Sequence, residues 1–412
     1  MTSRNPVSKN EPIVIVGAGV FGLSTALELK KRGYQNVTVI DRYLPPVVDG
    51  SSVDISRVIR VEYADPLYGK MAREAHEGWV KDYPDHYHES GFVMVSNGSG
   101  NSYIEKSKGI NQSLGDTLEE YENAHDIRKK FPEIQAKLDG MKAYYNKTGG
   151  WADAESSIRQ LAHQCSLAGV TFITGPRGRA VSLKYEGYKV VAINVAEGDP
   201  IPAAQVILAT GAWTNRLLPR NQGDLPRCPS SSTSVRASSS SPPTPNSHIL
   251  KIARHGYGYA TEVQVEDPLG QSRAVSSPKR DGNNANGSFL PEDAEQALRE
   301  GLQQLVPEFA SRDWLRNRLC WYSDTPEGDF IVDHHEVREN LFLATGGAGH
   351  AFKFLPILGK YIVDCYENKA PKELRHKWRL RAPTGKELVK QGDGSRGGPP
   401  LRRLSRAEQA KL

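Results

Sequence analysis

The first forty residues carry a pattern of apolar and polar positions that predicts a strand, a turn, a helix and a second strand. The run Ile13–Val16 is wholly apolar, which is typical of a strand buried on both faces of a sheet. From Leu23 to Leu29 apolar residues recur at helical spacing, and this pattern stops near Gly33. A second, largely apolar run follows at Val37–Ile40. Together these segments predict one β-α-β unit of about thirty residues.

Two later apolar runs have the same character as the first strand. They are Gln205–Thr210 and Asn340–Thr345, and each leads directly into a glycine. We expect both to return to the parallel sheet that Ile13–Val16 begins. The remaining pattern predicts helices at 68–79, 118–130, 154–168, 291–306 and 356–367, strands at 170–174 and 329–332, and a hairpin at 180–196.

The turn after the first strand has the spacing of a dinucleotide-binding loop, GAGVFG, from Gly17 to Gly22. In such a loop the first glycine permits a tight turn, the second lets the backbone approach a pyrophosphate, and the third allows close packing of helix on strand. The N-terminus of the helix then offers N–H groups to the phosphate. Asp41, 19 residues after Gly22, ends the second strand, where an acid binds a ribose hydroxyl. We therefore predict dinucleotide binding.

The glycine pattern does not by itself separate FAD from NAD. The predicted sheet draws its strands from the N-terminal, middle and C-terminal parts of the chain, whereas the nucleotide domain of an NAD dehydrogenase is more often contiguous. An interrupted domain favours a flavoprotein. The predicted fold class is therefore α/β combined with α+β, with an interrupted Rossmann-like FAD-binding domain and a mixed-sheet substrate domain.

Composition excludes several classes of protein. The chain has 412 residues, of which 38% are hydrophobic and 25% charged, so it is not wholly disordered. No apolar run approaches the ~20 residues of a transmembrane helix, and Met1–Pro12 is too polar for a signal peptide. Four cysteines at irregular spacing match neither a disulfide framework nor a zinc site. We expect a reduced, intracellular protein that binds no metal and no membrane.

The net charge of +5 is unevenly distributed along the chain. Residues 371–412 contain 12 Lys/Arg and 4 Asp/Glu, net +8, which leaves 41 and 44 elsewhere, net −3. No module of aromatic and basic residues accompanies this excess, so we expect a flexible basic tail and no nucleic-acid binding. A second unusual segment, Pro229–Ser247, holds 9 Ser and 4 Pro among its 19 residues. That composition predicts disorder.

Seven segments, in order between residues 12 and 367, are similar to segments of the sarcosine oxidase-like flavoproteins. This family includes the fungal saccharopine, pipecolate and fructosyl amino acid oxidases. The segments are GAGVFG with Asp41, DGSSVDISRVIRVEYADP (49–66), GWADAESS (150–157), ATGAWTNRLLP (209–219), LKIARHGYGY (250–259), CWYSDTPEGDFIVD (320–333) and ATGGAGHAFKFLPILG (344–359). The resemblance implies FAD, oxidation of an amine to an imine, and hydrogen peroxide as the by-product.

The resemblance gives roles to residues whose own sequence context is ambiguous. Cys320 matches the cysteine that carries FAD covalently, although a lone cysteine beside aromatic residues is more often simply buried. Lys251 matches a lysine near flavin N5, where a fixed positive charge stabilises superoxide during the reaction with oxygen. On residue type alone Lys251 is a solvated strand lysine. His255 matches an active-site histidine, and on residue type alone it is a loop histidine.

Two arginines, Arg57 and Arg60, are three residues apart, which puts both on one side of a helical turn. A guanidinium can bind a carboxylate with two hydrogen bonds. The resemblance assigns Arg60 to the substrate carboxylate, Arg57 to the neighbourhood of the flavin, Tyr322 to the substrate pocket, and Lys353 to the carboxylate or the flavin. The expected catalytic residues are Lys251, His255, Arg60, Tyr322 and Lys353. The expected cofactor-binding residues are Gly17, Gly19, Val20, Gly22, Asp41, Arg42, Ser51, Arg57, Cys320, Gly347, Phe352 and Lys353.

The matched segments predict a discontinuous domain organisation. We expect an FAD-binding domain at 10–65, 145–220 and 318–370, a substrate domain at 66–144 and 248–317, a disordered Ser/Pro-rich segment at 221–247, and a flexible basic tail at 371–412. The family usually has a longer ordered stretch between Pro219 and His248. Strands lost there would leave a sheet edge unpaired and the substrate pocket open. Divergence of this chain and a mis-spliced gene model are both open explanations.

The leading prediction is an FAD-dependent oxidase of secondary amines, either N-alkyl amino acids or a cyclic imino acid, that acts as a monomer on a small-molecule amine and oxygen. The alternatives are a flavin dehydrogenase that uses another electron acceptor and a flavin-binding protein with an inactive, truncated substrate domain. The chain ends Ala410-Lys411-Leu412, a variant of the SKL peroxisomal address. We expect the peroxisomal import receptor to read it, with the cytoplasm as the alternative location.

Overall fold

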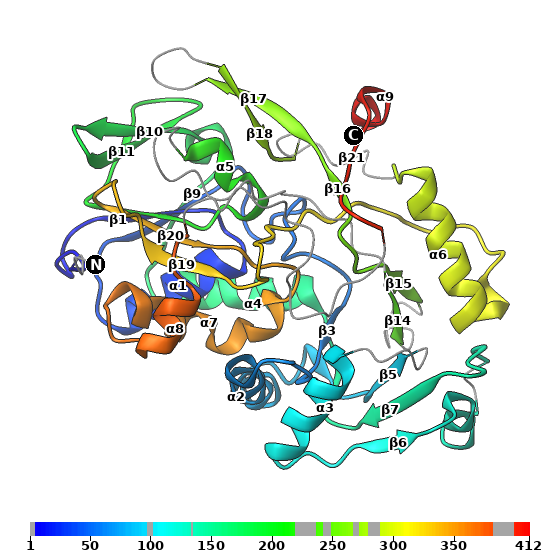
Figure 1. The fold of residues 1–412 in the computed structure, drawn as a ribbon. Helices are drawn as coiled ribbons and strands as arrows, with labels where there is room; N and C mark the ends of the chain where they lie inside the picture. Colours follow the sequence, from blue (N-terminus) through cyan, green and yellow to red (C-terminus); the bar gives the residue numbers. More distant parts are fainter. Residues whose placement is uncertain are drawn as a thin grey trace.

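A mixed sheet forms the centre of the nucleotide-binding half of the molecule (Figure 1). The computed structural model describes residues 5–96, 102–132, 135–218, 236–241, 249–266, 272–278, 289–381 and 399–412. Within these residues the sheet has the strand order β19, β20, β13, β1, β2, β9, with bounds Ile331–His334, Leu341–Thr345, Gln205–Leu208, Ile13–Val16, Val37–Ile40 and Thr171–Ile173. Strand β19 runs antiparallel to β20, and the other pairs are parallel.

The prediction that two distant apolar runs return to the first sheet is confirmed. Strand β13 pairs with β1, with Gln205 opposite Ile13, and β20 pairs with β13, with Leu341 opposite Val206. Because β2 lies on one side of β1 and β13 on the other, the strand order reverses at β1. The carboxyl ends of β1 and β13 therefore open a crevice at this reversal, which is where open α/β sheets bind their ligands.

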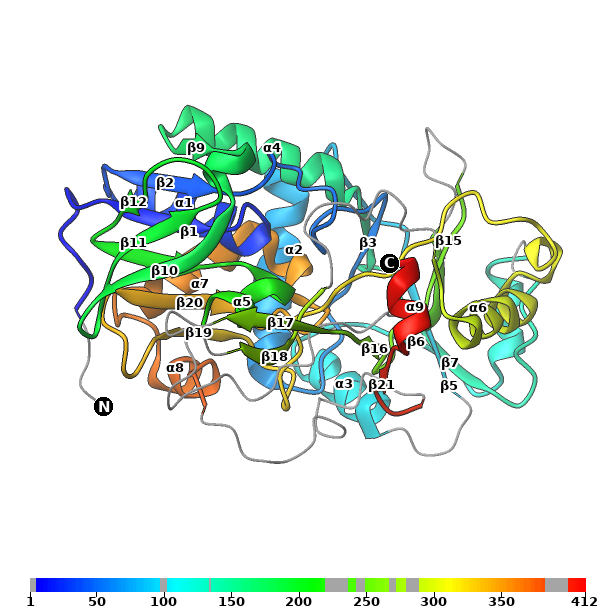
Figure 2. The ribbon, with the colours of Figure 1, turned by 90° about the horizontal axis from the view of Figure 1, so that it is seen from above.

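Helices cover one face of the sheet, and a small antiparallel sheet covers the other (Figures 1 and 2). Leu23, Trp79 and Phe342 are buried in the core on the helical side, and Val14 and Ile193 are buried on the opposite side. The helices are α1 (Val20–Lys31), α2 (Pro66–Asp82), α4 (Ala154–Leu167) and α7 (Leu355–Tyr366); the covering strands are β10 (Ala180–Glu186), β11 (Lys189–Val195) and β12 (Ile201–Pro202). The predicted hairpin at 180–196 is thus confirmed.

The other half of the molecule is built from short sheets and, among the described residues, from helices that include α3 (Ser102–Ser113) and α6 (Glu292–Leu305). The short helix α5 (Thr214–Leu217) follows β13 and instead contacts β10 of the nucleotide-binding half. One three-stranded sheet contains β3 (Arg57–Ile59), β8 (Gly150–Ala152) and β4 (Tyr87–His88), and another contains β5 (Phe92–Ser96), β7 (Lys142–Asn146) and β6 (Glu119–Tyr121). Two-stranded pairs join β14 (Arg236–Ser241) to β15 (Lys251–Ala253) and β17 (Glu262–Glu266) to β18 (Ser272–Ser276).

Two predictions for this half were wrong in part. The helix predicted at 118–130 is a strand, β6, followed by a 3-10 helix at Ala124–Lys129, because Glu119–Tyr121 pairs with β7 and the Asn123 side chain caps a new turn. Disorder was predicted for 221–247, yet Arg236–Ser241 forms β14. A serine-rich backbone can still hydrogen-bond to the open edge of β15. The rest of 221–247 lies outside the described residues.

The basic tail was predicted to be flexible, and the structure corrects this where it describes the tail. Helix α8 (Lys372–Lys377) buries Leu374 and leads to the fully buried Trp378. Strand β21 (Arg402–Arg403) pairs in parallel with β16 (Tyr259–Ala260), and helix α9 (Arg406–Lys411) follows it (Figure 2). A few apolar side chains between the charged ones anchor these elements, because each reaches an existing core.

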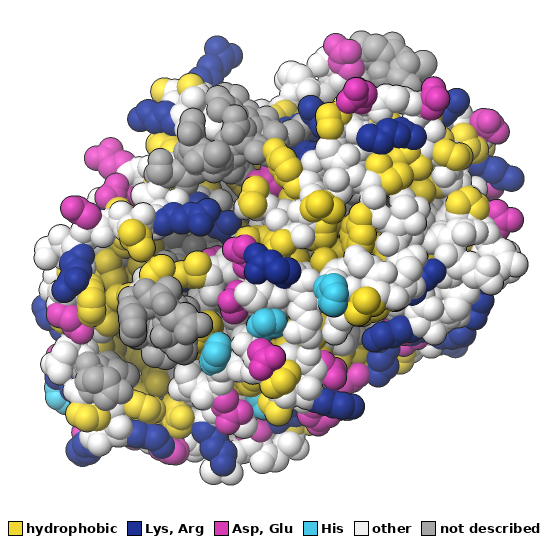
Figure 3. All heavy atoms as spheres, turned by 180° about the vertical axis from the view of Figure 1, so that it is seen from behind, with side chains coloured by type: hydrophobic (Ala, Val, Ile, Leu, Met, Phe, Trp, Pro, Cys, Tyr) yellow, Lys and Arg dark blue, Asp and Glu magenta, His cyan; other side chains and the backbone are white. Residues whose placement is uncertain are grey.

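The surface in Figure 3 mixes basic and acidic side chains over the part drawn in colour. Ion pairs also occur among the surface side chains of the described residues: Lys108 lies 2.9 Å from Glu120, and Lys360 lies 2.7 Å from Glu74. In the described part of the chain, no helix has both the length and the apolar character needed to cross a bilayer.

Candidate active site

The glycine-rich loop is held so tightly between β1 and α1 that side chains cannot be added to it. Gly17 has φ +111°, and a Cβ on it would lie 2.5 Å from the carbonyl oxygen of Ala209 at the end of β13. A Cβ on Gly22 would lie 1.9 Å from the carbonyl oxygen of Gly17. Both contacts are with backbone, which cannot rotate away. The glycines therefore let helix, loop and neighbouring strand meet at this point.

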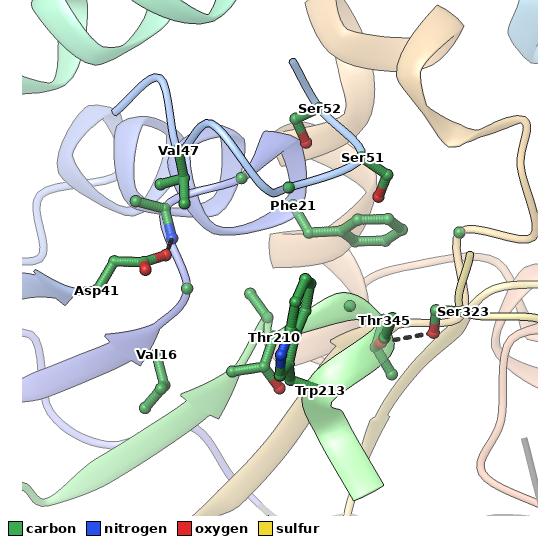
Figure 4. Close-up of a pocket in the computed structure, with 18 of the residues that line it drawn as sticks. Val16, Phe21, Asp41, Val47, Ser51, Ser52, Thr210, Trp213, Ser323 and Thr345 are labelled. Carbon is green, nitrogen blue, oxygen red and sulfur yellow. Dashed lines mark hydrogen bonds between the residues drawn. The ribbon is translucent and has the colours of Figure 1, made fainter. Parts of the chain in front are cut away.

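Two side chains fix the loop from outside it. Asp41 accepts hydrogen bonds from the backbone N–H of Ala18 at 2.8 Å and of Arg42 at 2.6 Å, and the first of these is drawn in Figure 4. Burial raises the pKa of Asp41. Ser52 Oγ accepts from the N–H of Val20, the first residue of α1, at 2.9 Å. Asp41, for which ribose binding was predicted, is thus seen to anchor the glycine-rich loop.

A cavity of about 370 Å³ extends from this loop to the segment around Gly347. Its wall comes from the glycine loop, the segment 50–57, the end of β13 and the segment 345–352. Figure 4 shows Thr210 and Trp213 across the pocket from Ser51 and Ser52. Arg42 bonds to Asp49 at 2.9 Å and lies over the Trp213 ring at 4.9 Å from its centroid, so a cation and an aromatic face meet at the nucleotide end.

Beside the other end of the cavity, three cations converge on one carboxylate. Asp54 lies 2.7 Å from Lys251 Nζ and 3.6 Å from Arg318 Nη2, and it accepts a hydrogen bond from Arg57. We call Asp54, Arg57, Lys251 and Arg318 the ion cluster. Burial alone would raise the pKa of Asp54, but the three cations outweigh burial and hold that pKa well below the ordinary carboxyl range.

The same cluster sets the ionisation of Lys251. Burial lowers the pKa of Lys251 to about 8, and the positive charges of Arg57 and Arg318 act in the same direction, whereas Asp54 opposes them. Lys251 also donates to the carbonyl oxygen of Ser56 at 2.6 Å. The lysine is therefore held at a fixed place with a proton that it can lose just above neutral pH.

Cys320, Tyr322 and His255 lie next to the ion cluster. Arg57 reaches Cys320 Sγ with Nη2 at 3.5 Å, and Arg57 itself lines the cavity. The rings of His255 and Tyr322 are 5.8 Å apart, and a Cβ on Gly349 would lie 2.4 Å from Tyr322 and 2.8 Å from His255. The glycine at 349 therefore leaves room for both rings, of which Tyr322 lines the cavity.

Arg60 and Lys353 meet at a second aromatic residue, Tyr63. Their charged groups lie 5.7 Å and 4.7 Å from the Tyr63 ring centroid. Arg60 donates to Tyr103 OH at 2.8 Å and to the carbonyl oxygen of Glu62. The two cations therefore form a positive end around one aromatic ring, separate from the ion cluster.

Most of the predicted cofactor residues line the cavity, whereas most of the predicted catalytic residues are not part of its lining. Those on the wall are Gly17, Gly19, Val20, Asp41, Arg42, Ser51, Arg57, Tyr322, Gly347 and Phe352. The other predicted residues lie outside the cavity lining. Gly22 supports the glycine-rich loop, Lys251 pairs with Asp54, and Cys320 contacts Arg57. His255 contacts Tyr322, and Arg60 and Lys353 flank Tyr63.

Sequence reasoning missed several residues that the structure places here. Asp54 and Arg318 complete the ion cluster, and Trp213 and Ser52 line the cavity. His350 also lines the cavity: its Nδ1 is 2.9 Å from Tyr63 OH, and its Nε2 is 2.8 Å from the Gly328 carbonyl oxygen. Asp54 lies within the matched segment 49–66, but the sequence does not show that Lys251 and Arg318 fold onto it.

Comparison with known proteins agrees with this geometry. The family model for FAD dependent oxidoreductases matches residues 12–365. The chain belongs to this family. Its members bind FAD, and the residues present fit that group: the glycine cradle admits no Cβ, an aspartate anchors the loop, and an aromatic and cationic wall faces it.

Individual relatives confirm the resemblance to the sarcosine oxidase-like amine oxidases and its fold class. L-saccharopine oxidase of Schizosaccharomyces pombe is 30% identical over 407 residues, covering 90% of this chain and 93% of that protein. Peroxisomal sarcosine oxidase of Mus musculus is 24% identical, covering 85% and 90%. The crystal structure of fructosamine oxidase (Amadoriase II) from Aspergillus fumigatus superposes with a TM-score of 0.82 at 27% identity, covering 96% of each chain.

Proposed function

We propose that this FAD-dependent oxidoreductase is an oxidase of secondary amines, with an N-alkyl or cyclic amino acid as substrate. Substrate and oxygen give an imine and hydrogen peroxide, and water then hydrolyses the imine. Bound FAD would supply the two-electron acceptor for the amine. The observation that carries the proposal is the ion cluster, which presents a fixed, largely buried cation beside the cavity. The relatives named above as oxidases of amines support the same reaction.

The substrate end of the site is assigned from its charges. We propose that Arg60 and Lys353, on either side of Tyr63, bind the substrate carboxylate, and that Tyr322 and His255 line the pocket for the amine. Fixing the carboxylate orients the amine carbon, which is the main contribution that the protein can make to such a reaction. The substrate would thus be held by its acid group while oxygen reacts near Lys251.

Lys251 is proposed to promote the reaction with oxygen. A positive charge that is already in place stabilises the negative charge that develops on oxygen, and it needs no reorganisation at the moment of reaction. Cys320 is proposed to carry FAD through its sulfur. In support, Cys320 Sγ lies 3.5 Å from the guanidinium of Arg57, which lines the cavity.

One preparation tests the proposed reaction. The purified protein is acid-precipitated, and the flavin is measured in pellet and supernatant. Peroxide is then assayed with sarcosine, pipecolate, saccharopine and fructosyl-lysine. The matched control for each substrate is the corresponding amine without the carboxylate. The proposal expects flavin in the pellet and peroxide from at least one acid. If the protein turns over only with artificial electron acceptors, it is a dehydrogenase and not an oxidase. If it binds flavin but shows no turnover with any acceptor, it is a flavin-binding protein.

We also propose a peroxisomal location and a monomeric state. A relative named as peroxisomal supports the location, as does a product that peroxisomes handle. The import receptor would be the partner, through Ala410-Lys411-Leu412. In the folded chain Leu412 is buried in the cluster that contains Trp321 and Leu404, so reading by the receptor requires α9 to detach from that cluster. A fluorescent fusion in fungal cells tests the location, with Leu412→Ala as the comparison, and light scattering tests the oligomeric state.

A further inference from the structure

We infer that Asp54 is a positioning residue for the oxygen side of the site: its carboxylate fixes Lys251 against the cavity wall and balances the charge of Lys251 between two arginines. This inference rests on the proposed oxidase reaction and extends it to a residue outside the substrate pocket. It predicts that one acidic side chain governs the reaction with oxygen while leaving substrate oxidation nearly untouched.

The contacts of Asp54 are concentrated on one oxygen atom. Oδ2 lies 2.7 Å from Lys251 Nζ and 3.6 Å from Arg318 Nη2, and it accepts a hydrogen bond from Arg57. The rest of the residue is anchored by the backbone. Oδ1 accepts from the N–H of Ile55 at 2.8 Å, and the Asp54 carbonyl accepts from the N–H of Glu155, at the start of α4, at 3.1 Å. The carboxylate therefore has a fixed orientation.

Three separate parts of the chain meet at this carboxylate. Asp54 and Arg57 come from β3 and the loop before it, Lys251 from β15, and Arg318 from the segment that continues to Cys320 and Tyr322. The four members of the ion cluster carry three positive charges and one negative charge. Cys320 and Tyr322 also interact with Arg57, and His255 contacts Tyr322.

Removing the negative charge of Asp54 would change the protonation of the lysine in the ion cluster but not that of the two arginines. Arginine does not lose its proton in proteins, whereas a desolvated lysine does so readily. Without Asp54, Lys251 would face Arg57 and Arg318 with no counter-charge, and it would become neutral at a lower pH. A neutral amine cannot stabilise negative charge on oxygen. Arg60 and Lys353 lie at Tyr63, so the binding of the substrate carboxylate would not follow the same change.

The first test separates the two half-reactions of the holoenzyme by stopped flow. In Asp54→Asn the oxygen reaction should decline at a lower pH than the native value near 8, because the pKa of Lys251 falls by about 1 to 3. At about pH 9 the oxygen rate should fall about tenfold or more, since above the pKa the protonated fraction drops tenfold each time the pKa falls by 1. Anaerobic reduction by substrate should change by less than about threefold, because sites without shared partners act nearly independently.

Two variants serve as matched controls for this test. Asp54→Glu keeps the charge and should restore most of the pH profile, which simple disruption of the fold would not allow. Asp116→Asn removes another largely buried carboxylate, which pairs with Arg73 of α2 away from the cavity, and it should leave the profile unchanged. An unshifted profile in Asp54→Asn, with the flavin retained, would overturn the inference.

A double-mutant cycle asks whether Asp54 acts through Lys251. In a Lys251→Met background, Asp54→Asn should change the oxygen rate by less than about twofold, since coupled residues are not additive. If Asp54→Asn lowers the oxygen rate by the same factor in both backgrounds, Asp54 acts independently of Lys251 and the inference is wrong.

A second readout does not depend on enzyme activity. A lysine with a folded pKa of about 8 and an ordinary value of 10.5 binds fewer protons when folded between these pH values. The free energy of unfolding of the full chain should therefore rise with pH above about 8, relative to Lys251→Met. In Asp54→Asn the rise should begin at lower pH. Matching pH slopes in both proteins would contradict the inference. If the unfolding free energy shows the expected pH slopes but the protein forms no peroxide, only the proposed function is refuted and the role of Asp54 stands.

Discussion

The nucleotide end of the cavity and the end beside the ion cluster are assembled from different kinds of chemical group. The core of the nucleotide end is the glycine loop together with the Asp41 side chain that anchors it, and these residues are close in the sequence. The other end uses charged side chains from β3, β15 and the segment around Arg318, which are far apart in the sequence. The first end should therefore be sensitive to added volume, and the second to altered charge.

Added volume at the nucleotide end should have the largest effect. Gly22→Val places side-chain atoms where a Cβ alone would lie 1.9 Å from a backbone oxygen. We expect loss of bound FAD and a fall of about 3 kcal/mol in the free energy of unfolding, measured by flavin absorbance and urea titration. Gly109→Ala, in α3 with nothing within 4 Å of an added Cβ, is the control. It should keep FAD and change stability by less than about 1 kcal/mol.

A change of charge beside the cavity should leave the fold and FAD in place. Lys251→Met keeps most of the side-chain volume and removes the cation. We expect the rate constant of the oxygen reaction to fall about 100- to 1,000-fold, while anaerobic reduction by the amine stays nearly constant. Rapid mixing of the substrate-reduced enzyme with oxygenated buffer measures this. Equal losses in both half-reactions would show that Lys251 supports the site as a whole.

The positive end around Tyr63 should show a smaller effect that depends on the substrate. Arg60→Lys keeps the charge but loses the planar fork. We expect kcat/KM for amino acid substrates to fall about 10- to 100-fold, through one charge-assisted hydrogen bond. Carboxylate-free amines should be unaffected. Arg159→Lys, at an exposed arginine of α4 that pairs with Glu155, should leave both classes of substrate unchanged. A similar loss for both classes would remove Arg60 from carboxylate binding.

Cys320→Ser should have the smallest effect on turnover and a clear effect on the flavin. If the thiol carries FAD, acid precipitation should release yellow flavin from the variant and leave it in the pellet of the native protein. Turnover should fall less than in Lys251→Met, because serine preserves the shape of the site and Arg57 remains. Flavin released equally from both proteins would show that the attachment is non-covalent and that this end binds FAD by contacts alone.

The local sequence pattern predicted those elements that are specified by residues close together in the sequence. The β1-α1-β2 unit, β13 and β20 follow from apolar composition and glycine spacing. Helix α3 was missed because it is polar and contains Gly109, which weakens its periodicity. The tail was misread because Trp378 and Leu404 stand singly among charged residues, and only the folded core shows that they are buried.

The site divides in the same way. Asp41 was predicted because its distance from Gly22 is a property of one motif. Asp54 and Arg318 were missed because neither residue type nor spacing distinguishes them from surface charges. Their importance arises only when β3, β15 and the segment around Arg318 come together. The resemblance to a family identified Lys251 and Cys320, but it did not show which residue positions them.

The pairing of β21 with β16 sets an order of events during synthesis. Leu404 packs in the cluster that contains Leu319 and Trp321, the neighbours of Cys320. A ribosome that adds about 5–20 residues per second needs roughly 4–17 seconds to travel from Trp321 to Leu404. Within this interval β20, the last strand of the nucleotide sheet along the chain, is completed well before Leu404 is added. The nascent chain can therefore offer a place for the nucleotide well before the wall behind Cys320 is closed.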